Sequence, residues 1–249
     1  MKTVPGASSP PTPLPEGRAE RTEPLRADRG RFTVDAVLFD LDGTLVDTID
    51  DLADAANAML AELGRPLRAR DEIHSFVGKG IANLVARCLG GDVADDVLAP
   101  ALACFRRHYT VLNGRRSAVY PGVIEALDAM RAMALRLACV TNKPAAFTGP
   151  LLERVGLAPY FAAVVSGDTL PVKKPDPAML AHACALLAVP TARALMIGDS
   201  ANDALAARAA GVPVLLVTWG YSEGMPVDTI ECDGLLSSAS QMLDRIRAG

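Results

Sequence analysis

The sequence lacks the features that mark membrane, disulfide-stabilised and nucleic-acid-binding proteins. Its five cysteines are scattered and odd in number, with no C-x-x-C pair, which indicates reduced thiols and neither disulfides nor a zinc site. They are Cys88, Cys104, Cys139, Cys184 and Cys232. No apolar run approaches the roughly 18 residues of a membrane span. The net charge of -4 offers no basic surface for nucleic acid. We therefore expect a cytoplasmic protein that binds neither membranes nor nucleic acid.

The first 32 residues contain almost no large apolar side chain before Phe32 and are rich in Pro, Arg, Glu and Ser. Such a segment cannot bury enough surface to offset the entropy that ordering costs. It lacks the apolar centre of a secretory signal, and its acidic residues argue against a transit peptide. We expect a disordered extension over residues 1–32.

The chain is organised around residues 34–44, an almost unbroken apolar run that ends in Asp40, Asp42, Gly43 and a threonine. Apolar residues without alternation are typical of a strand buried on both faces, and ligands bind at the carboxyl ends of such strands. Asp40 and Asp42 project to the same side of an extended chain. Gly43 lets the backbone turn close to a ligand. Taken alone, this pattern also fits a turn with a helix cap.

Helical periodicity dominates the next part of the chain, and strands alternate with helices after residue 117. The predicted helices of the first part cover residues 47–63, 71–77, 81–89 and 92–112. Later strands are predicted at 135–140, 161–165, 194–197 and 214–217, and later helices at 121–133, 144–155, 176–187, 202–210 and 235–247.

This order of elements predicts an α/β protein with a Rossmann-like, doubly wound parallel sheet. Residues 33–50 and 117–249 would form this core. Residues 51–116, which show no strand pattern, would form an all-helical cap domain inserted after the first strand.

Polar side chains follow three of the later strands, at the point where each strand ends. They are Thr141 and Asn142, Lys173 and Lys174, and Asp199 with Asp203. The carboxyl ends of parallel strands share one edge of a sheet, so these groups should lie beside Asp40 and Asp42. Each motif alone also fits a cap, a turn or a solvated residue. Their occurrence in order, each after a strand, favours a site.

The chemistry of these groups suits a phosphoryl group. A carboxylate cluster that retains water suits Mg²⁺, and a hydroxyl and an amide ahead of a helix N-terminus suit an anion. A lysine adds positive charge for phosphate oxygens. Together they predict a phosphoryl group held between a cation and a lysine, with a carboxylate placed to attack it.

These motifs resemble those of the haloacid dehalogenase-like hydrolases and, within them, the phosphoglycolate phosphatase family. The matching segments are Asp40-Leu41-Asp42-Gly43-Thr44, Thr141-Asn142-Lys143-Pro144, Lys174-Pro175 and Gly198-Asp199-Ser200-Ala201-Asn202-Asp203. The resemblance covers about residues 34–245.

The resemblance implies a role for each motif. Asp40 would attack phosphorus to form an aspartyl-phosphate, and Asp42 would protonate the leaving alkoxide and later activate water. Mg²⁺ would be held by the side chains of Asp40 and Asp199 and by the Asp42 carbonyl, with Asp203 and Gly43 in support. The phosphoryl oxygens would be bound by Thr141, Asn142 and Lys174.

Weaker similarities point to the phosphoglycolate branch and hence to 2-phosphoglycolate, a small phosphorylated metabolite. They lie in residues 46–52, in the cap loop Gly78-Lys79-Gly80, in residues 170–177 and in residues 218–221. Lys79 departs from the neutral residue that is more usual between such glycines. It would either reach the substrate carboxylate or lie in solvent.

Other functions remain open to different degrees. A dehalogenase needs no acid two residues after its nucleophile, so Asp42 argues against one. Phosphomutases and phosphatases for sugar phosphates or pyrophosphate would retain all four motifs. A catalytically silent binding module would be expected to lack at least one of the acids or the lysine, and none is missing here. Oligomeric state and the role of the extension stay open.

Overall fold

The computed structural model describes residue 1 and residues 30–249, so most of the expected N-terminal extension lies outside the described residues. Phe32, the last residue of the expected extension, belongs to the folded part of the chain. Phe32 opens strand β1 (Phe32–Val34), its side chain is buried, and the Arg245 guanidinium lies 5.9 Å from its ring centroid. The expected boundary at residue 32 is therefore too late, because Phe32 packs into the core.

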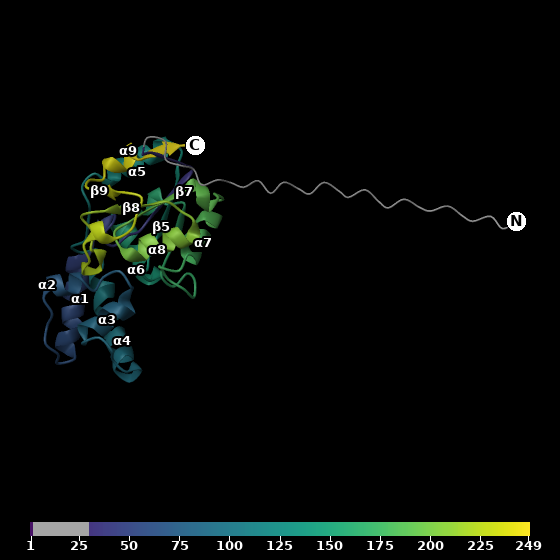
Figure 1. Ribbon diagram of the computed structural model, residues 1–249. Helices are drawn as coiled ribbons and strands as arrows, with labels where there is room; N and C mark the ends of the chain where they lie inside the picture. Colours follow the sequence, from purple (N-terminus) through teal and green to yellow (C-terminus); the bar gives the residue numbers. More distant parts are fainter. Residues whose placement is uncertain (2–29) are drawn as a thin grey trace.

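Within residues 30–249, six strands form a parallel sheet in the order β6-β5-β2-β7-β8-β9. Figure 1 labels β5, β7, β8 and β9 of this sheet. They are β2 (Ala36–Phe39), β5 (Arg136–Val140), β6 (Ala163–Val165), β7 (Ala194–Gly198), β8 (Val214–Val217) and β9 (Leu235–Leu236). Phe39 of β2 pairs with Cys139 on one side and with Ile197 on the other. The predicted parallel sheet is confirmed. The strand order reverses at β2, the position where open α/β sheets bind ligands.

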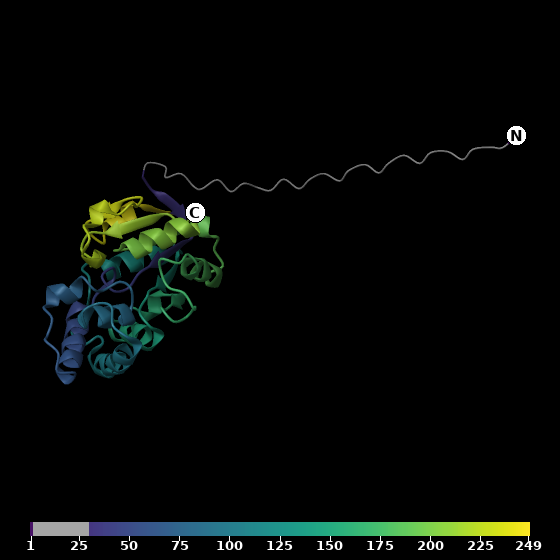
Figure 2. The same ribbon diagram turned by 60° about the horizontal axis from the view of Figure 1, so that its bottom comes forward.

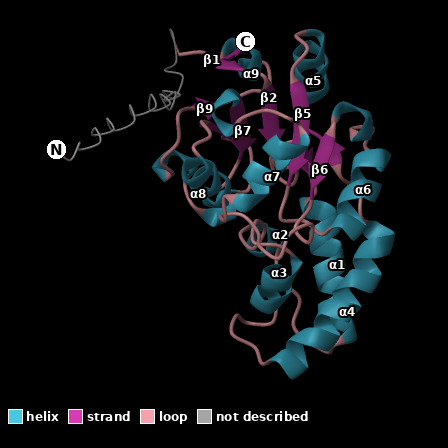
Figure 3. Cartoon of the chain, turned by 90° about the vertical axis from the view of Figure 1, so that its right-hand side faces the viewer, coloured by secondary structure: helices cyan, strands magenta, loops and turns pink. Residues whose placement is uncertain are grey.

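Helices cover both faces of this sheet (Figure 3). Helices α5 (Val123–Ala132), α6 (Ala145–Arg154) and α9 (Gln241–Asp244) pack on one face, and α7 (Ala178–Leu186) and α8 (Ala201–Ala210) pack on the other. Val37 and Phe39 belong to the first core, whereas Ala36 and Leu38 belong to the second. Strand β2 is apolar at every position because it is covered on both faces.

Four helices form a separate group beside the sheet (Figures 1 and 2). They are α1 (Ile49–Glu62), α2 (Arg70–His74), α3 (Ile81–Cys88) and α4 (Asp95–Leu112). We call residues 51–116 the cap segment. Met59, Phe105 and Tyr109 are fully buried in a hydrophobic cluster that also includes Phe147 and Tyr221 from outside this segment. In the described chain no strand lies inside this segment, as expected. Its standing as a domain stays a prediction.

Short elements join these parts. Strand β3 (Val46–Asp47) pairs antiparallel with β4 (Ala118–Val119), so the two connections to the cap segment run side by side. Short 3-10 turns lie in the loops of residues 30–249, at η1 (Ala158–Tyr160), η2 (Thr191–Arg193), η3 (Ser222–Gly224) and η4 (Val227–Thr229).

Two expectations about strands and helices were wrong. The predicted helix over residues 235–247 is instead β9, the single turn α9 and strand β10 (Ile246–Ala248), because Leu236 and Ile246 are buried through strand pairing. Val34 does not extend the central strand. It lies in β1, which pairs with β10. Among the described residues, no helix combines the length and apolar character that a membrane span requires.

Candidate active site

Three carboxylates meet at the carboxyl edge of the sheet. Asp40 follows β2, Asp199 follows β7, and Asp203 lies in the first turn of α8. Each offers one oxygen within 4.8 Å of the other two, and all three side chains are largely buried. The parallel direction of β2 and β7 brings these acids together, as the sequence predicted.

Lys174 lies inside this cluster and is almost fully buried. Its Nζ is 2.9 Å from Asp40 Oδ1 and 2.7 Å from Asp203 Oδ1, and it donates a hydrogen bond to the Val140 carbonyl at 2.6 Å. Burial alone would lower the pKa of Lys174, but Asp203 and Asp40 outweigh burial and raise it. The ammonium group therefore stays charged. Lys173, by contrast, is exposed.

Burial and mutual repulsion make the carboxylates costly to ionise. Burial raises the pKa of Asp40 to about 7, with the charges of Asp203 and Asp42 adding to the rise and Lys174 opposing it. Burial, Asp40 and Asp203 likewise raise the pKa of Asp199 well above its ordinary value. A bound cation would relieve this repulsion.

The hydrogen bonds identify which oxygens remain for such a cation. Asp203 uses one oxygen for Lys174 and the other for Ser200, whose N–H and hydroxyl donate at 3.1 and 2.9 Å. Asp199 Oδ2 accepts the Tyr221 N–H at 2.6 Å. In the described chain Asp40 Oδ2 and Asp199 Oδ1 have no hydrogen-bond partner. An all-oxygen donor set of this kind fits Mg²⁺.

Gly43 permits this arrangement because its backbone lies against the Asp199 carboxylate. Its φ of 86° is in the left-handed region, and a Cβ at this position would overlap Asp199 Oδ2. Any other residue would be strained here and would displace the carboxylate. The close approach expected of Gly43 is therefore present.

Asp42 lies outside the group of three and has its own partners. Its Oδ1 accepts hydrogen bonds from Thr48 Oγ1 at 2.8 Å and from Lys143 Nζ at 2.9 Å. Lys143 Nζ also donates to the Tyr109 hydroxyl of α4 at 2.6 Å, and its side chain is only 2% exposed. Burial alone would lower the pKa of Lys143, but Asp42 outweighs it, so the pKa is raised.

Sequence reasoning did not select Lys143 or Tyr109 for the site. The available signal for Lys143 was its place directly after Thr141 and Asn142, at the end of a predicted strand. Tyr109 carried no signal, because its place in a helix of apolar periodicity is equally typical of a core residue.

Asn142 and Thr141, two of the three residues expected to bind phosphoryl oxygens, differ in which of their groups remain free. Asn142 uses its side-chain amide to donate to the carbonyls of Gly78 and Lys174 at 3.0 and 2.9 Å, and to accept the Lys174 N–H at 2.9 Å. Its side chain thus fixes the cap loop and the lysine. In the described chain the main-chain N–H groups of Leu41, Asp42 and Asn142 have no hydrogen-bond partner. Thr141 is buried and lines the pocket described next.

A pocket that is partly open to solvent lies between this edge of the sheet and the cap segment. One wall is polar and the other is apolar. The polar wall is formed by Asp40, Asp42, Thr141, Asn142 and Lys143, and the other by Leu52, Val77, Gly78, Gly80, Ile81 and Leu84. The cap segment therefore contributes most of the surface that would contact the non-reacting part of a ligand.

Lys79 does not line this pocket, although its neighbours Gly78 and Gly80 do. Its side chain is 56% exposed, and its Nζ lies 3.2 Å from Glu223 Oε2, a residue of the loop after β8. The structure therefore places Lys79 in an ion pair across the boundary between cap segment and core.

Comparisons with known proteins agree with this geometry. A family model described as haloacid dehalogenase-like hydrolase matches residues 34–211. The chain is 49% identical over 209 residues to a phosphoglycolate phosphatase of Nitrosospira multiformis, covering 82% of this chain and 92% of that protein. It is 45% identical over 212 residues to a phosphoglycolate phosphatase of Thiobacillus denitrificans, covering 84% and 93%.

A solved structure is similar over the same part of the chain. It is described as a predicted phosphoglycolate phosphatase from Haemophilus somnus, with a TM-score of 0.79 and 29% sequence identity. The match covers 85% of this chain and 97% of that one.

Proposed function

This chain belongs to the haloacid dehalogenase-like hydrolases, and from that premise we propose that it is a Mg²⁺-dependent phosphatase that hydrolyses 2-phosphoglycolate to glycolate and phosphate. One observation supports the chemistry above all others. A buried, charged Lys174 lies beside the Asp40 carboxylate, so a nucleophile and a positive charge for the phosphoryl group occur together.

The donor set fits Mg²⁺, which would be held by Asp40 Oδ2, Asp199 Oδ1 and the Asp42 carbonyl. When bound, it would offset the negative charge of the carboxylates and of the transferred phosphoryl group. Gly43 and Asp203 support this site, the first by its close backbone approach and the second by fixing Lys174 and the turn at Ser200.

The first half of the reaction forms an aspartyl-phosphate. An Asp40 oxygen bonds to phosphorus as the bond from phosphorus to the substrate oxygen breaks, and Asp42 gives its proton to that alkoxide. Thr141 and the free N–H groups of Leu41, Asp42 and Asn142 hold the phosphoryl oxygens, and the charge of Lys174 stabilises them from beside Asp40. In the second half Asp42 takes a proton from water, which attacks phosphorus and releases Asp40.

Lys143 is a positioning residue in this scheme. Asp42 must present one carboxyl oxygen to the leaving group and later to water. Thr48 and Lys143 fix its orientation, and Tyr109 holds Lys143 from the cap segment. The acid is therefore tied to both parts of the chain.

The substrate assignment rests on the named relatives and on the pocket. A pocket with a polar wall and an apolar wall, partly open to solvent, suits a short phosphorylated metabolite. A phosphomutase would share the carboxylates and the lysine. It differs in returning the phosphoryl group to a sugar instead of releasing phosphate.

A Mg²⁺-dependent phosphate-release screen tests the proposal. It compares kcat/KM for 2-phosphoglycolate with values for sugar phosphates, pyrophosphate and nucleotides. We expect 2-phosphoglycolate to lead by about 100-fold, equivalent to ~2.7 kcal/mol of transition-state discrimination. A lead by a sugar phosphate or pyrophosphate would overturn the substrate and retain the chemistry. Isomerisation without phosphate release would indicate a mutase.

A further inference from the structure

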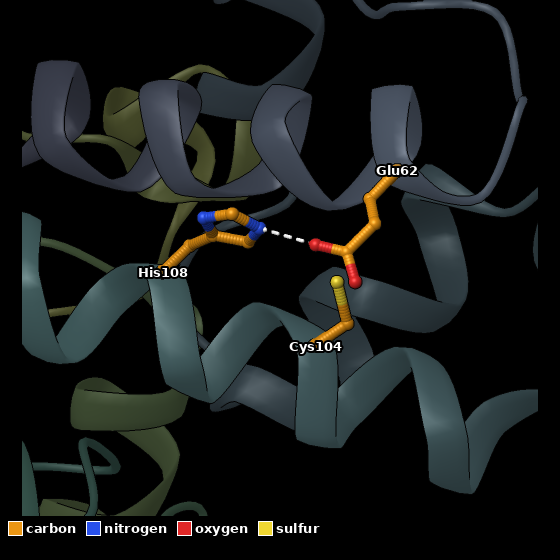
Figure 4. Close-up of side chains that lie close together, drawn as sticks. All are labelled: Glu62, Cys104 and His108. Carbon is orange, nitrogen blue, oxygen red and sulfur yellow. Dashed lines mark hydrogen bonds and ion pairs between the residues drawn. The ribbon is translucent and has the colours of Figure 1, made fainter.

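A second cluster of potential metal ligands lies in the cap segment, remote from Asp40. It consists of Glu62, Cys104 and His108, each of which offers one ligand atom within 4.8 Å of the other two (Figure 4). His108 Nε2 lies 2.9 Å from Glu62 Oε2, and Cys104 Sγ points toward the same carboxylate. The three side chains therefore converge on a common point.

The helices hold this convergence in place. Cys104 and His108 are four residues apart on α4, so they lie on the same face of that helix. Glu62 is the last residue of α1, which packs along α4. The helix α1 starts after Thr48, a partner of Asp42, so at about 1.5 Å per residue the cluster lies roughly 20 Å from the candidate active site.

The donor types distinguish this cluster from the carboxylates around Asp40. Sulfur, imidazole nitrogen and one carboxylate oxygen form a set that suits Zn²⁺ and disfavours Mg²⁺. Three protein ligands with a fourth position open to solvent is a common arrangement for Zn²⁺. The side chain of His108 is 31% exposed and that of Glu62 is 49% exposed, so an ion can enter from solvent.

Arg107 is the charged neighbour of the cluster. Its guanidinium donates to Glu62 Oε1 and, at 3.5 Å, to Cys104 Sγ, whereas His108 contacts the other Glu62 oxygen. An ion that binds Glu62 Oε2 would replace its contact with His108 and leave the arginine contact in place. Burial and Glu62 raise the pKa of the Cys104 thiol, and Arg107 acts as an outer partner that opposes this rise and favours the Glu62 carboxylate.

We propose that Glu62, Cys104 and His108 bind Zn²⁺ and that this ion fastens the C-terminal end of α1 to α4. Binding requires the Cys104 thiol to lose its proton, which passes to solvent as the sulfur–metal bond forms. The ion binds the folded cap segment only, because the unfolded chain separates Glu62 from the other two ligands. It therefore stabilises the fold by mass action.

Cobalt substitution tests this site on the full-length, reduced protein with excess Mg²⁺ present. Co²⁺ bound to a thiolate has a sulfur-to-metal charge-transfer absorption that an all-oxygen site lacks, so binding near Asp40 does not interfere. We expect this band in the wild type, its removal by Zn²⁺, and its loss in Cys104→Ser. The matched control is Cys88→Ser, which changes a buried cysteine of the same segment that lies outside the cluster.

The exposed ligands provide variants that should fold normally. His108→Asn and Glu62→Gln should each weaken Zn²⁺ binding, measured by calorimetry, by at least about tenfold. Loss of an outer partner of a metal ligand already costs about tenfold or more, so loss of a direct ligand should cost no less. The wild type and Cys88→Ser should gain thermal stability with Zn²⁺, and Cys104→Ser should not. No charge-transfer band in the wild type, or an unchanged band in Cys104→Ser, would overturn the proposal. Neither result depends on which phosphate ester is hydrolysed.

Discussion

At the residue scale, the hydrogen-bond partners of each acid in the site determine which of its oxygens remain free to bind a ligand. Both oxygens of Asp203 are paired, one with Lys174 and one with Ser200. Asp40 and Asp199 each have one oxygen without a hydrogen-bond partner among the described residues. Asp42 is held by Thr48 and Lys143. The same residue type thus occurs in three different hydrogen-bonding environments at one edge of the sheet.

Asp40→Asn should abolish turnover and leave the fold intact. Loss of a nucleophile costs at least about 10⁴-fold in kcat. Because the pKa of Asp40 is raised to about 7 from 3.8, its ionisation costs folding free energy above pH 3.8 and most fully above pH 7. Without metal, the variant should therefore gain stability relative to wild type at pH 8 and lose that gain near pH 4. Steady-state kinetics and thermal unfolding at both pH values measure this. Substantial remaining activity would mean that the nucleophile is another residue.

Lys143→Met should lower kcat more than it raises KM, because Asp42 loses a partner that orients it. The loss should be larger for alkyl phosphates than for p-nitrophenyl phosphate, whose leaving group needs little protonation. Tyr109→Phe should have the same pattern at smaller amplitude, since Lys143 keeps its contact with Asp42. Equal losses on both substrates would indicate a general packing role for Lys143.

At the element scale, the ends of the cap segment are fastened to each other by a buried acid. Asp51 of α1 is fully buried, and it accepts hydrogen bonds from the N–H groups of Gly114, Arg116 and Ser117 at 2.9 to 3.0 Å. These residues form the return connection that leads into β4. A helix N-terminus and a loop about 60 positions later are thereby held together.

Asp51→Asn should destabilise the protein by about 3 kcal/mol, because the introduced amide donor faces N–H groups that need an acceptor. Urea unfolding measures the loss. Asp54→Asn on the same helix is the control, since Asp54 is exposed in its contact with Arg116 and should contribute less than about 1 kcal/mol. Equal, small effects for both variants would show that Asp51 does not anchor the connection.

The ion pair between Lys79 and Glu223 joins the cap loop to the loop after β8. Lys79→Ala should reduce kcat/KM by a modest factor and Glu223→Ala by a larger one, because Glu223 also accepts a hydrogen bond from Asn202. A double-mutant cycle should give a coupling of roughly 0.2–1 kcal/mol. The loss should be the same for 2-phosphoglycolate and for esters without a carboxylate. A selective loss on 2-phosphoglycolate in Lys79→Ala alone would instead assign Lys79 to the substrate carboxylate.

At the scale of the whole molecule, Mg²⁺ would link residues that are far apart in the chain. Asp40 ends β2 and Asp199 follows β7, so binding favours the assembled sheet over the unfolded chain. Mg²⁺ at 100 times its Kd should add ~2.7 kcal/mol of stability, and a chelator should remove it. Thermal unfolding tests this with Asp199→Asn, which should lose the effect, and Asp128→Asn, a surface control. An effect that persists in Asp199→Asn would place the ion elsewhere.

The sequence by itself determined the parallel sheet and the acids at its carboxyl edge. A buried strand needs apolar residues at every position, and chain direction fixes which end carries the polar ones, so Asp40 and Asp199 could be placed together from local pattern alone. The same logic failed for residues 235–247, where two strand pairings replaced a helix of plausible local pattern. Pairing partners far along the chain leave no local signal.

Only the tertiary structure decided how the side chains are used. The contacts of Lys143 with Asp42 and Tyr109 join residues up to 101 positions apart. The amide of Asn142 is turned to the cap loop, and Lys79 is turned to Glu223. Sequence pattern reports which element carries a side chain. The rotamer and the partners of that side chain depend on how the cap segment packs against the sheet, which sequence pattern does not report.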